Sequence, residues 1–145
     1  MIQVTKRDGT KEPLNIDKLH KVTFYACEGI TGVSPSEVEI KSQIQFYTGM
    51  QTSVIQETLI KAAADLISEE TPNYQYVGGR LINYALRKQV YGGYEPCHVK
   101  TLVEKNVERG FYDPELLEYY TEDEWDKINS FIKHERDENL NYVAM

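Results

Sequence analysis

Hydrophobic and polar residues alternate at the start of the chain and then recur at helical spacing. Ile2 to Thr5 alternates apolar and polar side chains, Asp8-Gly9 is a tight-turn dipeptide, and Lys11 to Leu14 can return as a second short strand. A helix follows between Asn15, a candidate N-cap, and Gly29, a candidate stop. Its apolar face consists of Ile16, Leu19, Val22, Thr23 and Ala26. This pattern predicts a small β-hairpin that leads into an amphipathic helix.

Three more helices are predicted before residue 92, over residues 34–48, 53–67 and 72–91. Ser34-Pro35 opens the first of them, Thr52 or Ser53 caps the second, and Gly92-Gly93 closes the third. Gly78-Gly79 weakens the first half of the last helix. The apolar face of the helix over 34–48 is expected at Val38, Ile40, Ile44 and Phe46.

The helical pattern continues after Glu95-Pro96 over residues 99–109, 114–119 and 122–133, in segments that are more polar and acidic. The order of elements predicts an α+β fold that is mainly α, with a small β-hairpin or three-stranded cap on a four-helix bundle. Residues 1–92 form the predicted compact domain, and residues 93–145 form a helical extension.

Composition and charge narrow the class of protein. The proportions of hydrophobic residues, 41%, and charged residues, 27%, are ordinary for a globular chain. No apolar run is long enough for a signal peptide or a membrane span, and the two cysteines, Cys27 and Cys97, lie far apart, so we expect a cytoplasmic protein that does not act at a membrane and has no disulfide framework. The net charge of −7 argues against a general nucleic-acid binder.

Positive charge is concentrated at the N-terminus, where residues 1–22 contain five basic side chains and three acidic ones. A phosphate near this turn would meet Lys6, Arg7, free backbone N–H groups and the start of a helix. Lys88 could add another cation. The alternative is that Lys6, Arg7 and Lys11 are solvated charges that protect an exposed edge strand. The chain contains no GxxxxGK[ST] loop, so a P-loop nucleotidase is not supported.

Residues suited to catalysis or metal binding form no convincing group. His20, His98 and His134 are scattered and lack metal-ligand spacing, so no catalytic residue and no metal site is predicted. The acidic run from Glu122 to Asp126 is interpreted as a solvated helix face rather than a cation site. Composition and spacing alone thus predict a small α+β domain with a candidate anion site near its N-terminus.

Several separated motifs carry a resemblance to a known family. The strings are "VTKRDG", "LNIDKLHKV", "IQFYTGMQTSVIQETLIKAAADLI" and "PNYQYVGGRLINYALRKQVYGGYEP". In this order they resemble the N-terminal ATP-cone region of the large subunit of class I ribonucleotide reductase, over residues 4–96. The strings "GFYDPELLEYYTEDEW" and "IKHERD" resemble the stretch that joins the cone to the catalytic barrel in the bacterial and bacteriophage enzymes.

The resemblance implies a function in deoxyribonucleotide synthesis for DNA replication: an overall-activity switch that binds ATP or dATP as an allosteric effector, with Mg²⁺ as an optional companion of the triphosphate. It implies the following roles by position. Lys6 and Arg7 contact phosphates, Glu12 and Asn15 meet the ribose or base, Lys18 lies near the triphosphate, Thr52 faces the base, and Lys88 completes the cationic cradle. Many dATP-inhibited members carry histidines where this chain has Gln56 and Ala85, so weak dATP inhibition is expected.

The resemblance also implies partners. The family's catalytic cysteines belong to the later barrel, so this oxidoreductase segment is not expected to be active alone. Its expected partners are the remaining large-subunit polypeptide and the small radical-generating subunit. The alternative function is an assembly piece with a degenerate cone, which docks on the rest of the reductase without sensing dATP; Gln56 and Ala85 motivate it.

Overall fold

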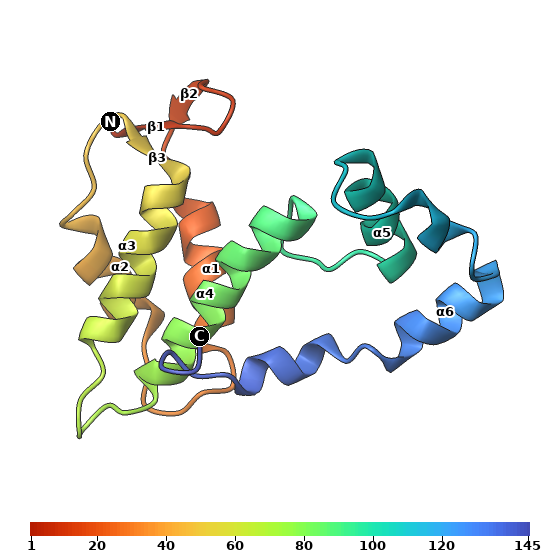
Figure 1. Ribbon diagram of the computed structural model, residues 1–145. Coiled ribbons are helices and arrows are strands. Elements are labelled where there is room, and N and C mark those ends of the chain that lie inside the picture. The colour runs from red at the N-terminus through yellow and green to blue at the C-terminus, as the bar shows by residue number, and fades with distance from the viewer. The chain divides into compact units, whose positions relative to one another are not determined.

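The computed structural model describes residues 1–145, which divide into two compact units (Figure 1). The first unit contains residues 1–85 together with residues 137–145, and the second contains residues 86–136. The fold is mainly helical with one small sheet, so the predicted α+β class is confirmed. None of the helices combines the length and the hydrophobicity needed to cross a lipid bilayer.

Three short strands form the sheet in the order β2-β1-β3. Strand β1 (Gln3–Thr5) pairs antiparallel with β2 (Lys11–Pro13) and parallel with β3 (Met50–Gln51). The turn between β1 and β2 is closed by hydrogen bonds from the Lys6 N–H to the Thr10 carbonyl, 2.8 Å, and from the Gly9 N–H to the Lys6 carbonyl, 3.0 Å. Gly9 has a φ of 84°, a left-handed conformation that glycine adopts without strain. The predicted hairpin is confirmed, and β3 makes the sheet three-stranded.

Four helices follow or adjoin the sheet in the first part of the chain: α1 (Ile16–Cys27), α2 (Pro35–Gln43), α3 (Thr52–Asp65) and α4 (Tyr74–Tyr91) (Figure 1). Asn15 is the N-cap of α1, as predicted, because its side-chain oxygen accepts a hydrogen bond from the Lys18 N–H at 3.0 Å. Helix α2 contacts both α1 and α3. The core of the first unit is built from these elements and β1, with Leu19, Ala26, Val38, Leu59, Ala62, Tyr74, Val77 and Leu81 buried.

Three details of the helix predictions are wrong. Helix α2 ends at Gln43 and not near Thr48, and residues 44–49 form a non-helical connection to β3. Ile40 and Ile44 are 64% and 81% exposed, so they do not form an apolar face with the buried Val38. The side of α2 that is buried carries Val38, Glu39 and Ser42, whose spacing of three and four residues places them on one helical face, whereas the predicted set does not share a face. The N-cap position of α3 is Gln51 and not Thr52 or Ser53, and the Gln51 side chain makes no capping hydrogen bond, because β3 runs directly into the helix.

The chain's last residues pack against the first half of α4. The Tyr142 N–H donates a 2.8 Å hydrogen bond to the Gln75 carbonyl. A Cβ atom at Gly79 would overlap the Leu140 carbonyl oxygen and lie 2.9 Å from the Asn141 carbonyl carbon, and one at Gly78 would lie 3.3 Å from the Tyr142 side chain. The glycine pair therefore allows two backbones to approach closely, at the expense of helix propensity.

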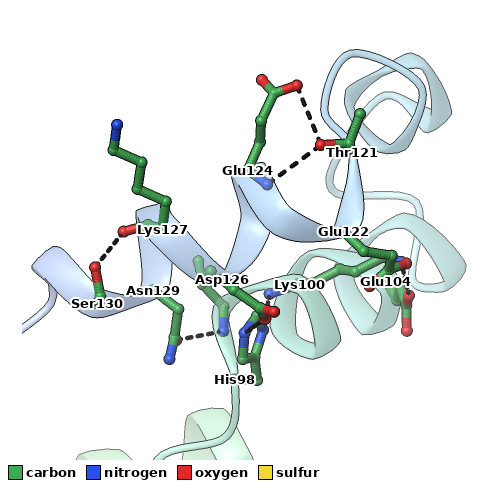
Figure 2. Close-up of polar contacts among 11 residues, drawn as sticks. His98, Lys100, Glu104, Thr121, Glu122, Glu124, Asp126, Lys127, Asn129 and Ser130 are labelled. Carbon is green, nitrogen blue, oxygen red and sulfur yellow. Dashed lines mark hydrogen bonds and ion pairs between the residues drawn. The ribbon is translucent and has the colours of Figure 1, made fainter.

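The second unit contains α5 (Val99–Glu108), the 3₁₀ helix η1 (Pro114–Leu117) and α6 (Glu122–Phe131); a further 3₁₀ helix, η2 (His134–Asn139), spans its end. Trp125 is its buried residue, and the indole ring packs edge-on against Tyr120 with 5.2 Å between ring centroids. Helices occur at all three predicted positions, and η2 was not predicted. Polar contacts join the start of α5 to α6 (Figure 2).

Candidate functional site

The turn after β1 places two opposite charges side by side. The Lys6 ammonium lies 2.9 Å from a Glu12 carboxylate oxygen, and both side chains are partly exposed, at 43% and 36%. The hydrogen bond and the charge of Lys6 lower the pKa of Glu12, and those of Glu12 raise the pKa of Lys6. Both groups are therefore ionised over the whole physiological pH range.

The start of α1 continues the site. Residues 12–18, from Glu12 to Lys18, line an open hollow of about 520 Å³. Lys18 lies close enough to Glu12 to lower the pKa of that carboxyl further, after the larger effect of Lys6. Asn15 lies in the same wall, but its side-chain oxygen already accepts the cap hydrogen bond. Lys6, Glu12 and Lys18 thus form one electrostatic cluster, of which Glu12 and Lys18 line the hollow.

The sheet brings the start of α3 to the same end of the first unit. Thr5 pairs with Gln51 across the parallel strands, and its hydroxyl donates a 3.0 Å hydrogen bond to the Gly49 carbonyl. Thr52 follows Gln51 as the first residue of α3, while Lys6 follows Thr5. Residues that are far apart in sequence are therefore neighbours here.

Of the remaining two predicted residues, one directly follows Lys6 and the other lies far along the chain. Arg7 is exposed in the β1–β2 turn. Lys88 lies in the last turn of α4, in the second unit, where its ammonium is 5.6 Å from the centroid of the Tyr94 ring. Its assignment to the phosphate cradle stays a prediction. Lys11 lies on β2, which is an edge strand, and its solvated charge fits the edge-protection interpretation better than Lys6 does, because Lys6 is ion-paired.

The acidic run at the start of α6 uses its charges in contacts with α5. The Asp126 carboxylate accepts a 2.9 Å hydrogen bond from His98 Nε2, because His98 Nδ1 already accepts from the Lys100 N–H. Glu122 pairs with Lys100 (Figure 2). The Asn129 side chain accepts a 2.9 Å hydrogen bond from the Val99 N–H. The Glu122 and Asp126 side chains stay 74% and 71% exposed, so the predicted solvated face is confirmed. Their contacts with α5 are an additional structural role.

One buried carboxylate was not singled out from the sequence. Glu39, on α2, is 5% exposed and accepts from the Thr23 hydroxyl; it lies 2.7 Å from the His20 ring nitrogen Nδ1. These contacts tie α2 to α1. Two features of the sequence indicate this buried cluster. His20 and Thr23 are three residues apart on one helix, and Glu39 is next to Val38. The cluster is built for packing and lies outside the hollow.

The comparison with protein families concerns most of the residues described above. The profile of the ATP cone domain family matches residues 2–89, which include the sheet, the hollow and almost all of α4. The chain belongs to the ATP cone domain family.

Similar proteins show where such a domain occurs. The chain is 50% identical over 144 residues, 99% of its length, to the ribonucleoside-diphosphate reductase subunit alpha of Haemophilus influenzae. It is 52% identical over 142 residues, 98% of its length, to the ribonucleoside-diphosphate reductase 1 subunit alpha of Escherichia coli. It is 44% identical over 144 residues to the subunit alpha of Enterobacteria phage T4. The match is to their N-terminal region, and the chain spans 19% of the length of each. The predicted resemblance is confirmed.

The residues around the hollow fit a nucleotide by the chemistry of their donors and acceptors. Lys6 and Lys18 carry the positive charges that phosphate oxygens require. Glu12, which is held ionised, accepts hydrogen bonds and therefore suits the hydroxyl groups of a sugar. A cluster that contained only lysines would suit any anion, whereas this mixed cluster suits a ligand with both phosphates and hydroxyl donors.

Proposed function

We propose that this chain is the overall-activity regulatory module of a ribonucleoside-diphosphate reductase large subunit, with ATP or dATP as its effector. The cluster of Lys6, Glu12 and Lys18 beside the hollow carries this proposal, because it lies inside the matched cone and combines cations with a hydroxyl acceptor. In this proposal residues 1–92 are the cone, with α1 to α4 as its helical bundle, and residues 93–145 are the extension.

The proposed roles of the site residues follow from their chemistry. Lys6, Arg7, Lys18 and Lys88 would neutralise the phosphates, and Mg²⁺ could accompany them. Glu12 and Asn15 would meet the sugar or base, and Thr52 would face the base. The rest of the large subunit and the small radical-generating subunit are the proposed partners. Gln56 and Ala85 predict that inhibition by dATP is weak.

Calorimetric titration of the chain with ATP and with dATP tests this function. Saturable binding is expected, and an effector that binds only the folded state should stabilise it by about 2.7 kcal/mol at a hundredfold excess over Kd. The double substitution Lys6→Ala, Arg7→Ala should remove both the heat and the stabilisation. Absence of heat and of a thermal shift at millimolar nucleotide would refute the proposal.

Exposed apolar side chains support a second candidate, an assembly role without nucleotide sensing. Three large apolar side chains in and after α2 are exposed: Ile40 at 64%, Ile44 at 81% and Tyr47 at 58%. A group of exposed apolar side chains is typical of a surface that binds another protein. Mixing the chain with the remaining reductase polypeptide should then restore activity equally with and without Lys6→Ala, Arg7→Ala. Loss of restoration in the double variant would contradict this candidate.

A further inference from the structure

A carboxylate lies among the cations that a phosphate chain would use. Glu12 pairs with Lys6 at 2.9 Å and is also influenced by the charge of Lys18. Asp17 lies in the same wall of the hollow as Glu12 and Lys18. These four side chains comprise two cations and two anions, so their formal charges cancel.

This balance makes the hollow a poor site for a simple anion. A phosphate that takes Lys6 must first separate it from Glu12, and it then lies beside a carboxylate that remains ionised. Like charges at such short range repel, and the repulsion grows with the charge of the ligand. Lys6 and Lys18 alone would attract any polyphosphate, whereas Glu12 opposes one that has only acceptor oxygens.

A ligand that carries hydroxyl or amino donors next to its phosphates avoids this penalty. Its donors can hydrogen-bond to the Glu12 carboxylate when Lys6 turns to the phosphates, so neither side chain is left without a partner. A site with a buried or partly buried acceptor discriminates strongly against ligands that lack the matching donor. Glu12 therefore serves both states: it holds Lys6 in the empty site and accepts the sugar's donors in the filled one.

We propose that Glu12 is a specificity-determining residue that admits nucleoside triphosphates and excludes inorganic polyphosphates through its ion pair with Lys6. The inference rests on the proposed nucleotide-binding function and adds that the site rejects polyphosphates that lack a nucleoside. It assigns Glu12 a role in discrimination, in addition to contact with the ligand.

The test compares ATP with inorganic tripolyphosphate, which has a similar chain of phosphates but no sugar or base. Binding of each to the 145-residue chain and to Glu12→Gln is measured by calorimetry at low ionic strength. Glutamine keeps the size of the side chain and removes its charge. Affinity for tripolyphosphate should rise about tenfold in Glu12→Gln, because repulsion between a multiply charged anion and one partly exposed carboxylate is of that order. Affinity for ATP should change by less than about threefold, since lost repulsion and a weakened sugar contact offset each other.

Glu70→Gln is the matched control, because it removes the same charge from an exposed loop between α3 and α4. It should leave both affinities as in the unchanged chain. Two results would overturn the inference while leaving the proposed function intact: ATP binds but Glu12→Gln does not alter the ratio of the two affinities, or Glu70→Gln alters it equally. If the unchanged chain fails to bind ATP, the proposed function itself fails, and the role of Glu12 fails with it.

Discussion

Two buried titratable side chains in the first unit hold their protons more tightly than usual. Burial raises the pKa of the Cys27 thiol to about 11. Burial, and then the hydrogen bond to Glu37, raises the pKa of the Tyr74 hydroxyl to about 12. That hydroxyl donates to Glu37 at 2.6 Å and accepts from the Ser34 N–H at 3.0 Å. Tyr74 therefore fixes the start of α2 against α4.

These shifts predict a loss of stability at alkaline pH. Since both pKa values are raised in the folded state, the unfolded chain releases its protons first, near the ordinary values of 9.0 and 10.0. The stability that these two protonated groups contribute to the folded state is complete below about pH 9. It is lost as the pH rises toward their folded-state pKa values. Urea unfolding at pH 8 and pH 10.5 should give a lower free energy of unfolding at the higher pH.

The variant Tyr74→Phe separates this effect from general alkaline damage. It should cost about 1–3 kcal/mol at pH 8, because Glu37 and the Ser34 N–H lose a hydrogen-bond partner. The free energy of unfolding of Tyr74→Phe should also fall less between pH 8 and pH 10.5 than that of the unchanged chain. A drop of the same size in both proteins would show that Tyr74 does not cause it.

At the scale of elements, the start of α1 has both a structural and a proposed binding role. Asn15 caps the helix through its side-chain oxygen and lines the hollow. Asn15→Ala should lower the free energy of unfolding by about 1 kcal/mol, because the Lys18 N–H loses its acceptor. Thermal melts of the two proteins measure this loss.

The substitution Asn15→Asp distinguishes the two roles. Aspartate is an equally good cap, so stability should be kept. The added negative charge beside Glu12 and Asp17 should weaken ATP binding several-fold in calorimetry. If Asn15→Asp binds ATP as tightly as the unchanged chain does, Asn15 does not line the nucleotide site.

Helix α4 depends on Gly79 for the packing of residues 137–145. Gly79→Val should lower the free energy of unfolding by about 2 kcal/mol, because the side chain would overlap the backbone of Leu140 and Asn141. Gly93→Val is the control, since a Cβ there meets nothing within 4 Å. Chemical denaturation should separate the two variants, and equal stabilities would contradict the close packing.

Local signals explain which elements could be predicted. Helix α1 has an N-cap, an apolar periodicity and a glycine stop, and each is encoded within a few residues. Strand β3 has two residues and exists because β1 lies beside it. Likewise, the sequence alone indicates only that the glycine pair in α4 lowers helix propensity. The contact with residues 140–142, which are distant in sequence, explains why glycine is needed there. Elements defined by long-range contacts leave no local pattern.

At the scale of the whole molecule, the two units differ in how much apolar surface they bury. The first has a core of thirteen buried residues, whereas Trp125 is the buried hydrophobic residue of the second. Hydrophobic burial is the main source of folding stability. Amide hydrogen exchange should therefore be markedly faster in α5 and α6 than in α3, and equal protection in the two units would contradict this expectation.

The candidate site was predictable in part. The sequence placed Lys6, Glu12 and Lys18 near one turn because they lie within thirteen residues of one another. It could not predict that Glu12 pairs with Lys6, since this depends on the register of the hairpin. Thr52 was assigned through the family resemblance, and the parallel pairing of β1 with β3 gives the physical reason why its backbone lies nearby.

Amide chemical shifts recorded during an ATP titration most directly test the claim that this end of the first unit binds nucleotide. The largest changes should fall in residues 6–18 and at the start of α3 near Thr52, where the hollow and the cluster lie. Residues 99–131, in α5 to α6, should show small changes. The claim would be contradicted if saturating ATP left residues 6–18 unshifted or moved mainly the signals of α5 and α6.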